Sequence, residues 1–280
     1  TDVIAERKSL KVRAVVFDVY GTLVISGSGD VGTVDATDRG SHIAEALEAV
    51  SLRSSLDEVP TIELLHREIE RANDAARSEA RPKPEVDIVD VWRRVLSRCI
   101  SDTGEESESG DRLPADAGVR LASQYEARAN PTWPMPGAAE LLGQLQQSGV
   151  PLGIVSNAQV FTPCLVEALL GGTPLDEGGF DLDLCVFSNR FRQAKPAPRL
   201  FDVLREALAR RGILPHETVY VGNDMLNDVW AASQAGLKTA WFAGDARSCR
   251  PRQEDPRCRS LRPDITLTSL MQLLDCLEIK

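Results

Sequence analysis

The residue best placed to do chemistry is an aspartate at the predicted end of a buried strand. Asp18 follows the apolar run Val12–Val16, and Gly21 and Thr22 then turn the chain. In an open α/β sheet, ligands bind at the carboxyl ends of the strands, so a carboxylate there can face substrate while its strand stays in the core. Taken alone, the segment is better explained as a surface turn, and the case for chemistry depends on three further segments.

These three segments offer groups that could act together with such a carboxylate. Ser156 and Asn157 end an apolar run, and their hydroxyl and amide groups can hydrogen-bond substrate oxygens without adding charge. Lys195 precedes a proline, and its ammonium could neutralise a carboxylate and a developing anion together. Asp224 and Asp228 lie four residues apart, so on a helix they would share a face. N-capping explains one of these two acids but does not easily explain both.

All four segments lie within an alternation of strand and helix patterns. Short apolar or β-branched runs, which favour strands, occur at Val12–Phe17, Pro151–Ser156, Leu184–Phe187, Thr218–Val221 and Leu237–Phe242. Between some of these runs, apolar residues recur on one helical face. One such stripe includes Leu141 and ends at Gly149, and another includes Leu204 and ends at Gly212. Strands alternating with helices are typical of parallel βαβ units, so the sequence predicts an α/β fold.

The interval 24–135 departs from this alternation, because its apolar residues recur with helical spacing. Two stripes predict helices that must pack against each other or against the sheet. The stripes are Ile62, Leu65, Ile69 and Ala72, and then Ile88, Val89, Trp92, Val95, Leu96 and Cys99. We therefore expect a helical domain inserted at 24–135 into a core made of residues 1–23 and 136–280, with Trp92 in its interior rather than in a pocket.

Two stretches of the insert read as loops. Residues 101–114 contain too few apolar side chains to pack and are predicted to be flexible. Residues 26–32 are rich in glycine and lie just past Asp18, where they could form either a flap over the site or a plain connector.

Composition excludes several classes of protein. The chain has 280 residues, of which 42% are hydrophobic, and no apolar stretch approaches the roughly 18 to 20 residues that span a bilayer. Its first residues are charged rather than built like a secretory leader, so we expect a cytoplasmic protein without a membrane partner. The six cysteines form no C-x-x-C pair, which favours reduced thiols over disulfides or a zinc site.

The net charge of −10 argues against nucleic acid as a partner. The one basic stretch, residues 247–262, is interrupted by acids and lacks aromatic residues that would stack on bases. We interpret that stretch as a solvated loop.

Taken in order along successive strand ends, Asp18, Ser156 with Asn157, Lys195, and Asp224 with Asp228 resemble the haloacid dehalogenase superfamily of aspartate-nucleophile hydrolases. The resemblance covers most of the chain outside the insert. It implies a doubly wound, Rossmann-like parallel sheet with a cap inserted between the first and second motifs. It also implies that Asp18 attacks the substrate and forms a covalent intermediate that water releases, with Ser156 and Lys195 holding the transferring group.

The first motif departs from the superfamily's phosphatases. These usually carry a second aspartate two residues after the nucleophile, as acid and base, and here that residue is Tyr20. Loss of such a group should slow the reaction by about 10²- to 10⁴-fold. The run Asp18 to Thr22 instead resembles the 2-haloacid dehalogenases, which attack carbon, expel a halide and use no metal. With either chemistry we expect Tyr20, Thr22 and Asn157 to contact substrate.

The fourth motif resembles the phosphatases instead, because Asp224 and Asp228 look like their metal-binding acids. Three carboxylates about 5 Å apart repel by about 3 kcal/mol per pair at an effective dielectric near 20, and Lys195 alone would not balance them. The sequence therefore predicts Mg²⁺ held by Asp18, the Tyr20 carbonyl, Asp224 and Asp228. In the longer of two possible registers, Asn223 takes the place of Asp224.

Three functions remain open on the sequence. The favoured one is a magnesium-dependent phosphatase acting on a small phosphorylated metabolite. The alternatives are a metal-free hydrolase like the 2-haloacid dehalogenases, with a halogenated substrate, and a phosphate-binding or regulatory protein with weak turnover. The sequence specifies neither the substrate nor the oligomeric state.

Overall fold

A six-stranded sheet forms the centre of the molecule. A computed structural model of the chain describes residues 9–27, 36–78, 83–100 and 113–279. The sheet has the strand order β6-β5-β2-β7-β8-β9, and every neighbouring pair is parallel. Its strands are β2 (Ala14–Phe17), β5 (Leu152–Ser156), β6 (Phe180–Phe187), β7 (Thr218–Gly222), β8 (Lys238–Phe242) and β9 (Ile265–Leu267). After β6 the chain crosses back past β2 to form β7, so the order reverses between β2 and β7, where open α/β sheets bind ligands.

Helices cover both faces of this sheet. Alternate residues of β2 point to opposite faces: Val15 and Phe17 pack in the cluster that contains Leu141, whereas Ala14 and Val16 pack in the cluster that contains Leu204. The covering helices are α5 (Ala138–Gln147), α6 (Thr162–Leu170), α7 (Ser188–Phe191), α8 (Arg199–Arg210), α9 (Ala231–Gln234) and α10 (Gln272–Cys276). The doubly wound α/β fold predicted from the sequence is therefore confirmed.

The remaining elements of the core are short. Strand β1 (Leu10–Val12) pairs in parallel with β10 (Leu277–Ile279). A π-helical turn, η3 (Met225–Trp230), follows β7, and 3₁₀ turns lie at η1 (Arg53–Ser55) and η2 (Pro215–Glu217). Among the described residues, none of the helices has the length and apolar character that a membrane span requires.

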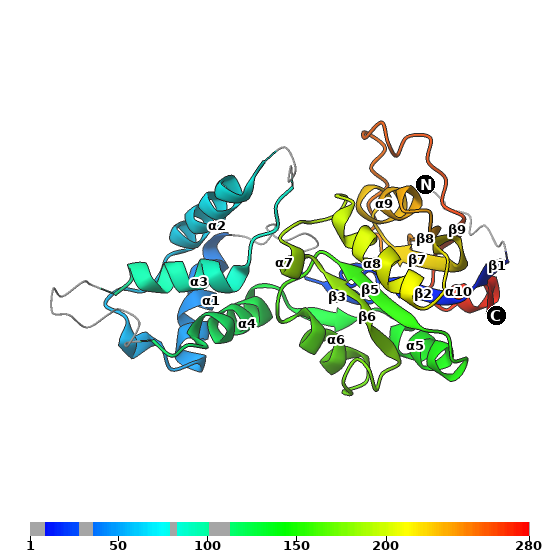
Figure 1. Ribbon diagram of the computed structural model, residues 1–280. Helices are drawn as coiled ribbons and strands as arrows, with labels where there is room; N and C mark the ends of the chain where they lie inside the picture. Colours follow the sequence, from blue (N-terminus) through cyan, green and yellow to red (C-terminus); the bar gives the residue numbers. More distant parts are fainter. Residues whose placement is uncertain (1–8, 28–35, 79–82, 101–112, 280) are drawn as a thin grey trace.

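The predicted insert has a hydrophobic core of its own. Its helices are α1 (Ala36–Ala49), α2 (Ile62–Ala76), α3 (Ile88–Arg98) and α4 (Ala117–Ala129). Figure 1 shows them as a bundle beside the sheet, in blue to green, joined to it near β3 and β4. Trp92 is fully buried among Leu47, Leu96 and Leu121, as expected of a core residue. Below, we call residues 24–135 the cap; its exact limits stay a prediction.

The cap is not purely helical, which corrects the interpretation of 24–135. Strands β3 (Val24–Ser26) and β4 (Thr132–Pro134) pair antiparallel, with Ile25 opposite Trp133. Each strand has only 3 residues, too few to show an alternating pattern in the sequence. The two predicted loops, 101–114 and 26–32, lie mostly outside the described residues.

Strands β5 and β6 approach each other closely at Gly153, where a larger residue would be crowded. A Cβ atom at Gly153 in β5 would lie 2.7 Å from the carbonyl oxygen of Leu184 in β6, whereas one at Gly143, in helix α5, would meet nothing within 4 Å. We expect Gly153→Ala to lower the free energy of unfolding by about 1–3 kcal/mol through overpacking. The matched variant Gly143→Ala should raise it by up to about 1 kcal/mol, because alanine favours a helix over glycine. Urea titration followed by circular dichroism measures both, and equal effects would contradict the prediction.

Candidate active site

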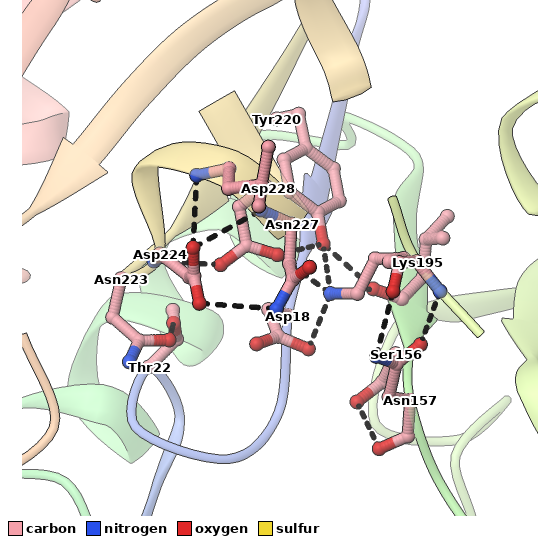
Figure 2. Close-up of polar contacts among 12 residues, drawn as sticks. Asp18, Thr22, Ser156, Asn157, Lys195, Tyr220, Asn223, Asp224, Asn227 and Asp228 are labelled. Atoms are coloured by element: carbon pink, nitrogen blue, oxygen red, sulfur yellow. Dashed lines mark hydrogen bonds and ion pairs between the residues drawn. The ribbon is translucent and has the colours of Figure 1, made fainter. Parts of the chain in front are cut away.

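The ammonium of Lys195 joins the predicted nucleophile, Asp18, to the predicted metal ligand Asp228. Its Nζ lies 2.9 Å from Asp18 Oδ1 and 2.6 Å from Asp228 Oδ1. It also donates to the carbonyl of Val155 at 3.1 Å and to the hydroxyl of Tyr220 at 2.9 Å. Figure 2 shows Asp18, Asp228 and Tyr220 around the Lys195 ammonium. Lys195 is only 3% exposed. A buried charge is tolerated when it is paired and hydrogen-bonded in this way.

This arrangement follows from the strand order. Asp18 ends β2, Val155 belongs to β5, and Asp228 lies in the turn after β7, so the carboxyl ends of three adjacent parallel strands meet at Lys195. Burial opposes the charge on Lys195, but the carboxylates of Asp18 and Asp228 outweigh it and raise the pKa of the lysine. Burial raises the pKa of Asp228, and the neighbouring ammonium partly offsets that effect.

The sequence analysis missed Tyr220, because a tyrosine within the apolar run of β7 looks like a core residue. Its ring is indeed fully buried against Phe201. Its hydroxyl, however, donates to the Val155 carbonyl at 2.7 Å and lies 3.1 Å from Asp228 Oδ1. Burial and the charge of Asp228 raise its pKa well above the usual range, so the hydroxyl stays protonated and can hold Lys195 in place.

Asn157 holds the backbone of Lys195. Its Oδ1 accepts from the Lys195 amide at 2.7 Å, and its Nδ2 donates to the Lys195 carbonyl at 3.4 Å. Ser156 and Thr22 are both fully buried, and neither lines the pocket described below. The hydroxyl of Ser156 donates to the Asn157 carbonyl at 3.3 Å. Ser156 and Thr22 therefore lie behind the reacting groups, not at the surface where substrate would bind.

Asp224 has a different set of partners from Asp18 and Asp228. It is the N-cap of η3, and its Oδ1 accepts from the amides of Leu226 and Asn227 at 2.8 and 3.1 Å. Its Oδ2 lies 2.6 Å from Arg252 Nη2 and 3.1 Å from Arg252 Nε. Burial favours the neutral acid, but the hydrogen bonds from Arg252 and these amides outweigh it and lower the pKa of Asp224.

The turn after β7 is π-helical, which corrects the expectation that Asp224 and Asp228 share an α-helical face. The Val229 amide donates to the Asp224 carbonyl at 3.2 Å, five residues back. Asp228 then reaches back along the turn, and its Oδ2 accepts from the Asp224 amide at 2.9 Å. The side chain of Asp228 is directed to Lys195, and that of Asp224 to Arg252.

Asn223, the alternative metal ligand, is held by neighbouring segments. Its Oδ1 accepts from the Thr22 hydroxyl at 3.3 Å, and its Nδ2 donates to the carbonyl of Ser248. Gly21 passes so close to this amide, at a φ of +83°, that any larger residue would collide with it. Both polar atoms of the Asn223 amide are therefore engaged, one with the first motif at Thr22 and the other with the segment at Ser248.

A pocket of about 450 Å³ lies over these groups. From the sheet side it is lined by Asp18, Tyr20, Asn157, Lys195, Asn223, Asp224 and Asp228. From the cap side it is lined by residues that include Ile69, Asn73, Glu85, Ile88, Glu126 and Asn130. All the predicted site residues except Ser156 and Thr22 thus face one pocket, and its size suits a small molecule.

Tyr20 does not replace the missing acid. Its hydroxyl lies 3.0 Å from the hydroxyl of Thr162. Burial raises its pKa, and the carboxylates of Glu126 and Asp18 raise it further against the effect of Thr162. The phenol therefore holds its proton at neutral pH.

The arginine-rich stretch 247–262 is not simply a solvated loop, which corrects the sequence interpretation. Arg250 and Arg252 line the pocket. The Arg250 amide donates to the Asn223 carbonyl at 3.0 Å, and the Arg250 carbonyl accepts from Met225 at 2.9 Å, so this segment runs beside the end of β7. Arg257, which pairs with Asp255 at 2.7 Å, has the solvated position that was expected.

The acids as arranged do not fit the predicted magnesium site. Asp18 and Asp228 share Lys195, and Asp224 is bound by Arg252, so a second cation supplies part of the positive charge that the sequence analysis attributed to a metal ion. Across the ranges that the structure describes, no group of three His, Cys, Asp or Glu side chains could hold a metal ion. Magnesium binding stays a prediction.

A hydrogen-bonded rim joins the cap to the strand ends. The Glu85 carboxylate accepts from Gln159 Nε2 at 2.7 Å and from the Ser188 hydroxyl at 2.9 Å. Gln159 also accepts from the amide of Ile88 at 3.1 Å. Burial raises the pKa of Glu85 to about 7, although both hydrogen bonds oppose the shift. This carboxyl group therefore changes charge near neutral pH at the boundary between cap and core.

The raised pKa of Glu85 makes folding stability depend on pH. Between pH 4.5, its ordinary pKa, and about 7, the folded chain keeps a proton that the unfolded chain has released. Stability is therefore lost as the pH rises through this window. Glu85→Gln stays neutral, so its free energy of unfolding relative to the wild type should rise by about 2 kcal/mol between pH 5 and pH 8.

Chemical denaturation at several pH values measures this difference. Glu140→Gln, at an exposed position on α5, is the matched control and should show no such slope. A difference between Glu85→Gln and the wild type that is constant across the range would contradict the assignment.

Known proteins resemble this chain in sequence and in fold. A family model described as a haloacid dehalogenase-like hydrolase matches residues 12–236. A phosphoglycolate phosphatase of Escherichia coli is 29% identical over 232 residues, covering 80% of this chain and 79% of the relative. A ribulose-1,5-bisphosphate 5-phosphatase of Halopiger xanaduensis is 28% identical over 170 residues, covering 61% and 67%. Among solved structures, a 2-haloacid dehalogenase of Pseudomonas syringae has a TM-score of 0.61 at 19% identity, covering 95% of this chain and 97% of that one.

Proposed function

The chain belongs to the haloacid dehalogenase-like hydrolase family, and we propose that it hydrolyses a phosphate ester of a small molecule with Asp18 as the nucleophile. One observation carries this proposal: Asp18 lies at the end of β2, in the pocket, with one carboxylate oxygen 2.9 Å from the buried ammonium of Lys195. A carboxyl group that is fixed by a lysine and faces a small-molecule pocket is suited to attack on phosphorus.

The proposed reaction has two steps. The oxygen of Asp18 that Lys195 does not hold attacks the phosphorus, and the bond from phosphorus to the ester oxygen breaks, which leaves an aspartyl phosphate and an alkoxide that takes a proton from solvent. Water then attacks the same phosphorus and gives a proton to solvent, and the bond from phosphorus to the Asp18 oxygen breaks, which releases inorganic phosphate and restores the carboxylate. Lys195 holds Asp18 in place, and Asp228 and Tyr220 hold Lys195.

Tyr20 sets a limit on the leaving group. Because its phenol keeps its proton and is bound to Thr162, it is a poor acid for the departing oxygen and a poor base for water. Esters with an acidic leaving group, such as aryl phosphates, should therefore react faster than alkyl phosphates.

The relatives support phosphate esters as the substrate class. Two of them are named as phosphatases of different small phosphorylated molecules, at 28–29% identity. The fourth motif adds to this support, since Asp224 and Asp228 resemble the acids of phosphatases. The predicted Mg²⁺ has no part in the steps above, because the acids are arranged around Lys195 and Arg252.

A second candidate is a dehalogenase reaction on a 2-haloacid. The run Asp18 to Thr22 and the engaged phenol of Tyr20 favour it, because carbon attack expels a halide that needs no proton. Halide release from short 2-haloacids distinguishes this candidate from the first, which predicts phosphate release alone.

Removal of the nucleophile tests the proposal directly. We expect Asp18→Asn to reduce phosphate release from a panel of phosphate esters by about 10⁴-fold or more, because the amide cannot form the covalent intermediate. Asp202→Asn, on the exposed surface of α8 beside Arg205, is the matched control and should keep full activity.

The covalent intermediate provides a second readout. Rapid quenching followed by peptide mass spectrometry should find a phosphoryl group on Asp18 of the wild type and none on the variant. A turnover that survives Asp18→Asn, or a phosphoryl group on another residue, would exclude this mechanism. If the chain releases neither phosphate nor halide and no adduct forms at Asp18, the result would favour a binding protein instead.

A further inference from the structure

Arg252 makes the closest contact to Asp224, at a place where the sequence predicts a metal ion. Its Nη2 lies 2.6 Å from Asp224 Oδ2, and its Nε lies 3.3 Å from Oδ1 and 3.1 Å from Oδ2. The guanidinium therefore contacts both oxygens of the carboxylate. Charge-assisted hydrogen bonds of this kind are about twice as strong as neutral ones.

The backbone around Arg250 and Arg252 is hydrogen-bonded to the residues that follow β7. Residues around Arg250 pair with the residues after β7, and Asp224 and Arg250 form a parallel bridge. Arg252 adopts a φ of +48°, a left-handed conformation that is uncommon for a residue with a side chain. Such a conformation persists only where the surrounding structure determines it. The position of the guanidinium is thus part of the fold of this segment.

The charged side chains of the site form two groups, in which two cations face three carboxylates. Lys195 lies between Asp18 and Asp228, and Arg252 is paired with Asp224. The remaining Asp224 contacts come from the turn itself, including Asn227 Nδ2 at 3.0 Å from Oδ2. A divalent cation needs ionised oxygen ligands with room around them. To bind here, it would have to displace Arg252 and share the pocket with a positive charge.

We propose that Arg252 supplies, at Asp224, the positive charge that a divalent cation would otherwise supply, so that the wild-type chain binds such an ion only weakly. Asp224 keeps its ionised form through this pairing, and Arg252 acts as a specificity-determining residue against metal ions. The inference concerns the same site as the proposed function, but it does not depend on the reaction that the site performs.

Metal binding by the intact chain tests this inference without any substrate. Mn²⁺ is the probe, and electron paramagnetic resonance reports the fraction of the ion that remains free. The wild type should bind it with a Kd weaker than about 1 mM. Arg252→Gln should bind it at least about tenfold more tightly, which corresponds to about 1.4 kcal/mol.

Further variants separate charge from other effects. Arg252→Gly removes the same guanidinium while tolerating the positive φ, so it should also gain affinity even if the glutamine variant folds poorly. Arg252→Lys keeps the charge and should bind Mn²⁺ more weakly than Arg252→Gln. Arg257→Gln, which removes an exposed arginine of the same segment, should bind like the wild type. Adding Asp224→Asn to Arg252→Gln should abolish the gain, which would locate the ion at Asp224.

Two results would overturn the inference. One is tight Mn²⁺ binding by the wild type that does not change in Arg252→Gln and Arg252→Gly. The other is weak binding by all variants, since Arg252 would then not be what keeps the ion out. Isothermal titration with Mg²⁺ should give the same order of affinities as Mn²⁺. Neither result bears on the aspartyl phosphate, whose absence would overturn the proposed function alone.

Discussion

The burial of one ammonium group constrains the whole site. Removing a lysine from water costs several kcal/mol unless acids and hydrogen-bond acceptors surround it, and Lys195 meets this requirement with Asp18, Asp228, Tyr220 and the Val155 carbonyl. These partners come from three neighbouring strands, so the parallel order of the sheet and the position of the lysine depend on each other. The nucleophile is held by the same contacts that make the buried charge tolerable.

The principal motifs could be predicted from the sequence because they stand at strand ends. Parallel strands bring their carboxyl ends to one edge, so Asp18 after β2 and Asp228 after β7 come together there, and Lys195, which follows α7, reaches the same edge. Helices α5 and α8 could also be predicted from the sequence, since the apolar residues of a helix recur over many residues. In both cases a local pattern and a general rule of the fold agree.

What the sequence did not reveal depends on long-range pairing. Arg252 lies among alternating arginines and acids, which read as solvated, and only the pairing of Arg250 with the end of β7 brings it to the pocket. The hydroxyl of Tyr220 is hidden within an apolar strand for a similar reason. The π-helical turn differs from an α-helix by one residue in the spacing of its hydrogen bonds, and the apolar pattern of so short a segment does not reveal this difference.

The pairing of β3 with β4 places the departure of the chain from the sheet beside its return. The cap, which has more than a hundred residues, is thus connected to the sheet like one long hairpin loop whose base is the β3–β4 pair. Insertions at such a point leave strand order and the nucleophile undisturbed. The part of the pocket wall that the cap supplies can accordingly diverge between relatives while the chemistry beneath it stays the same.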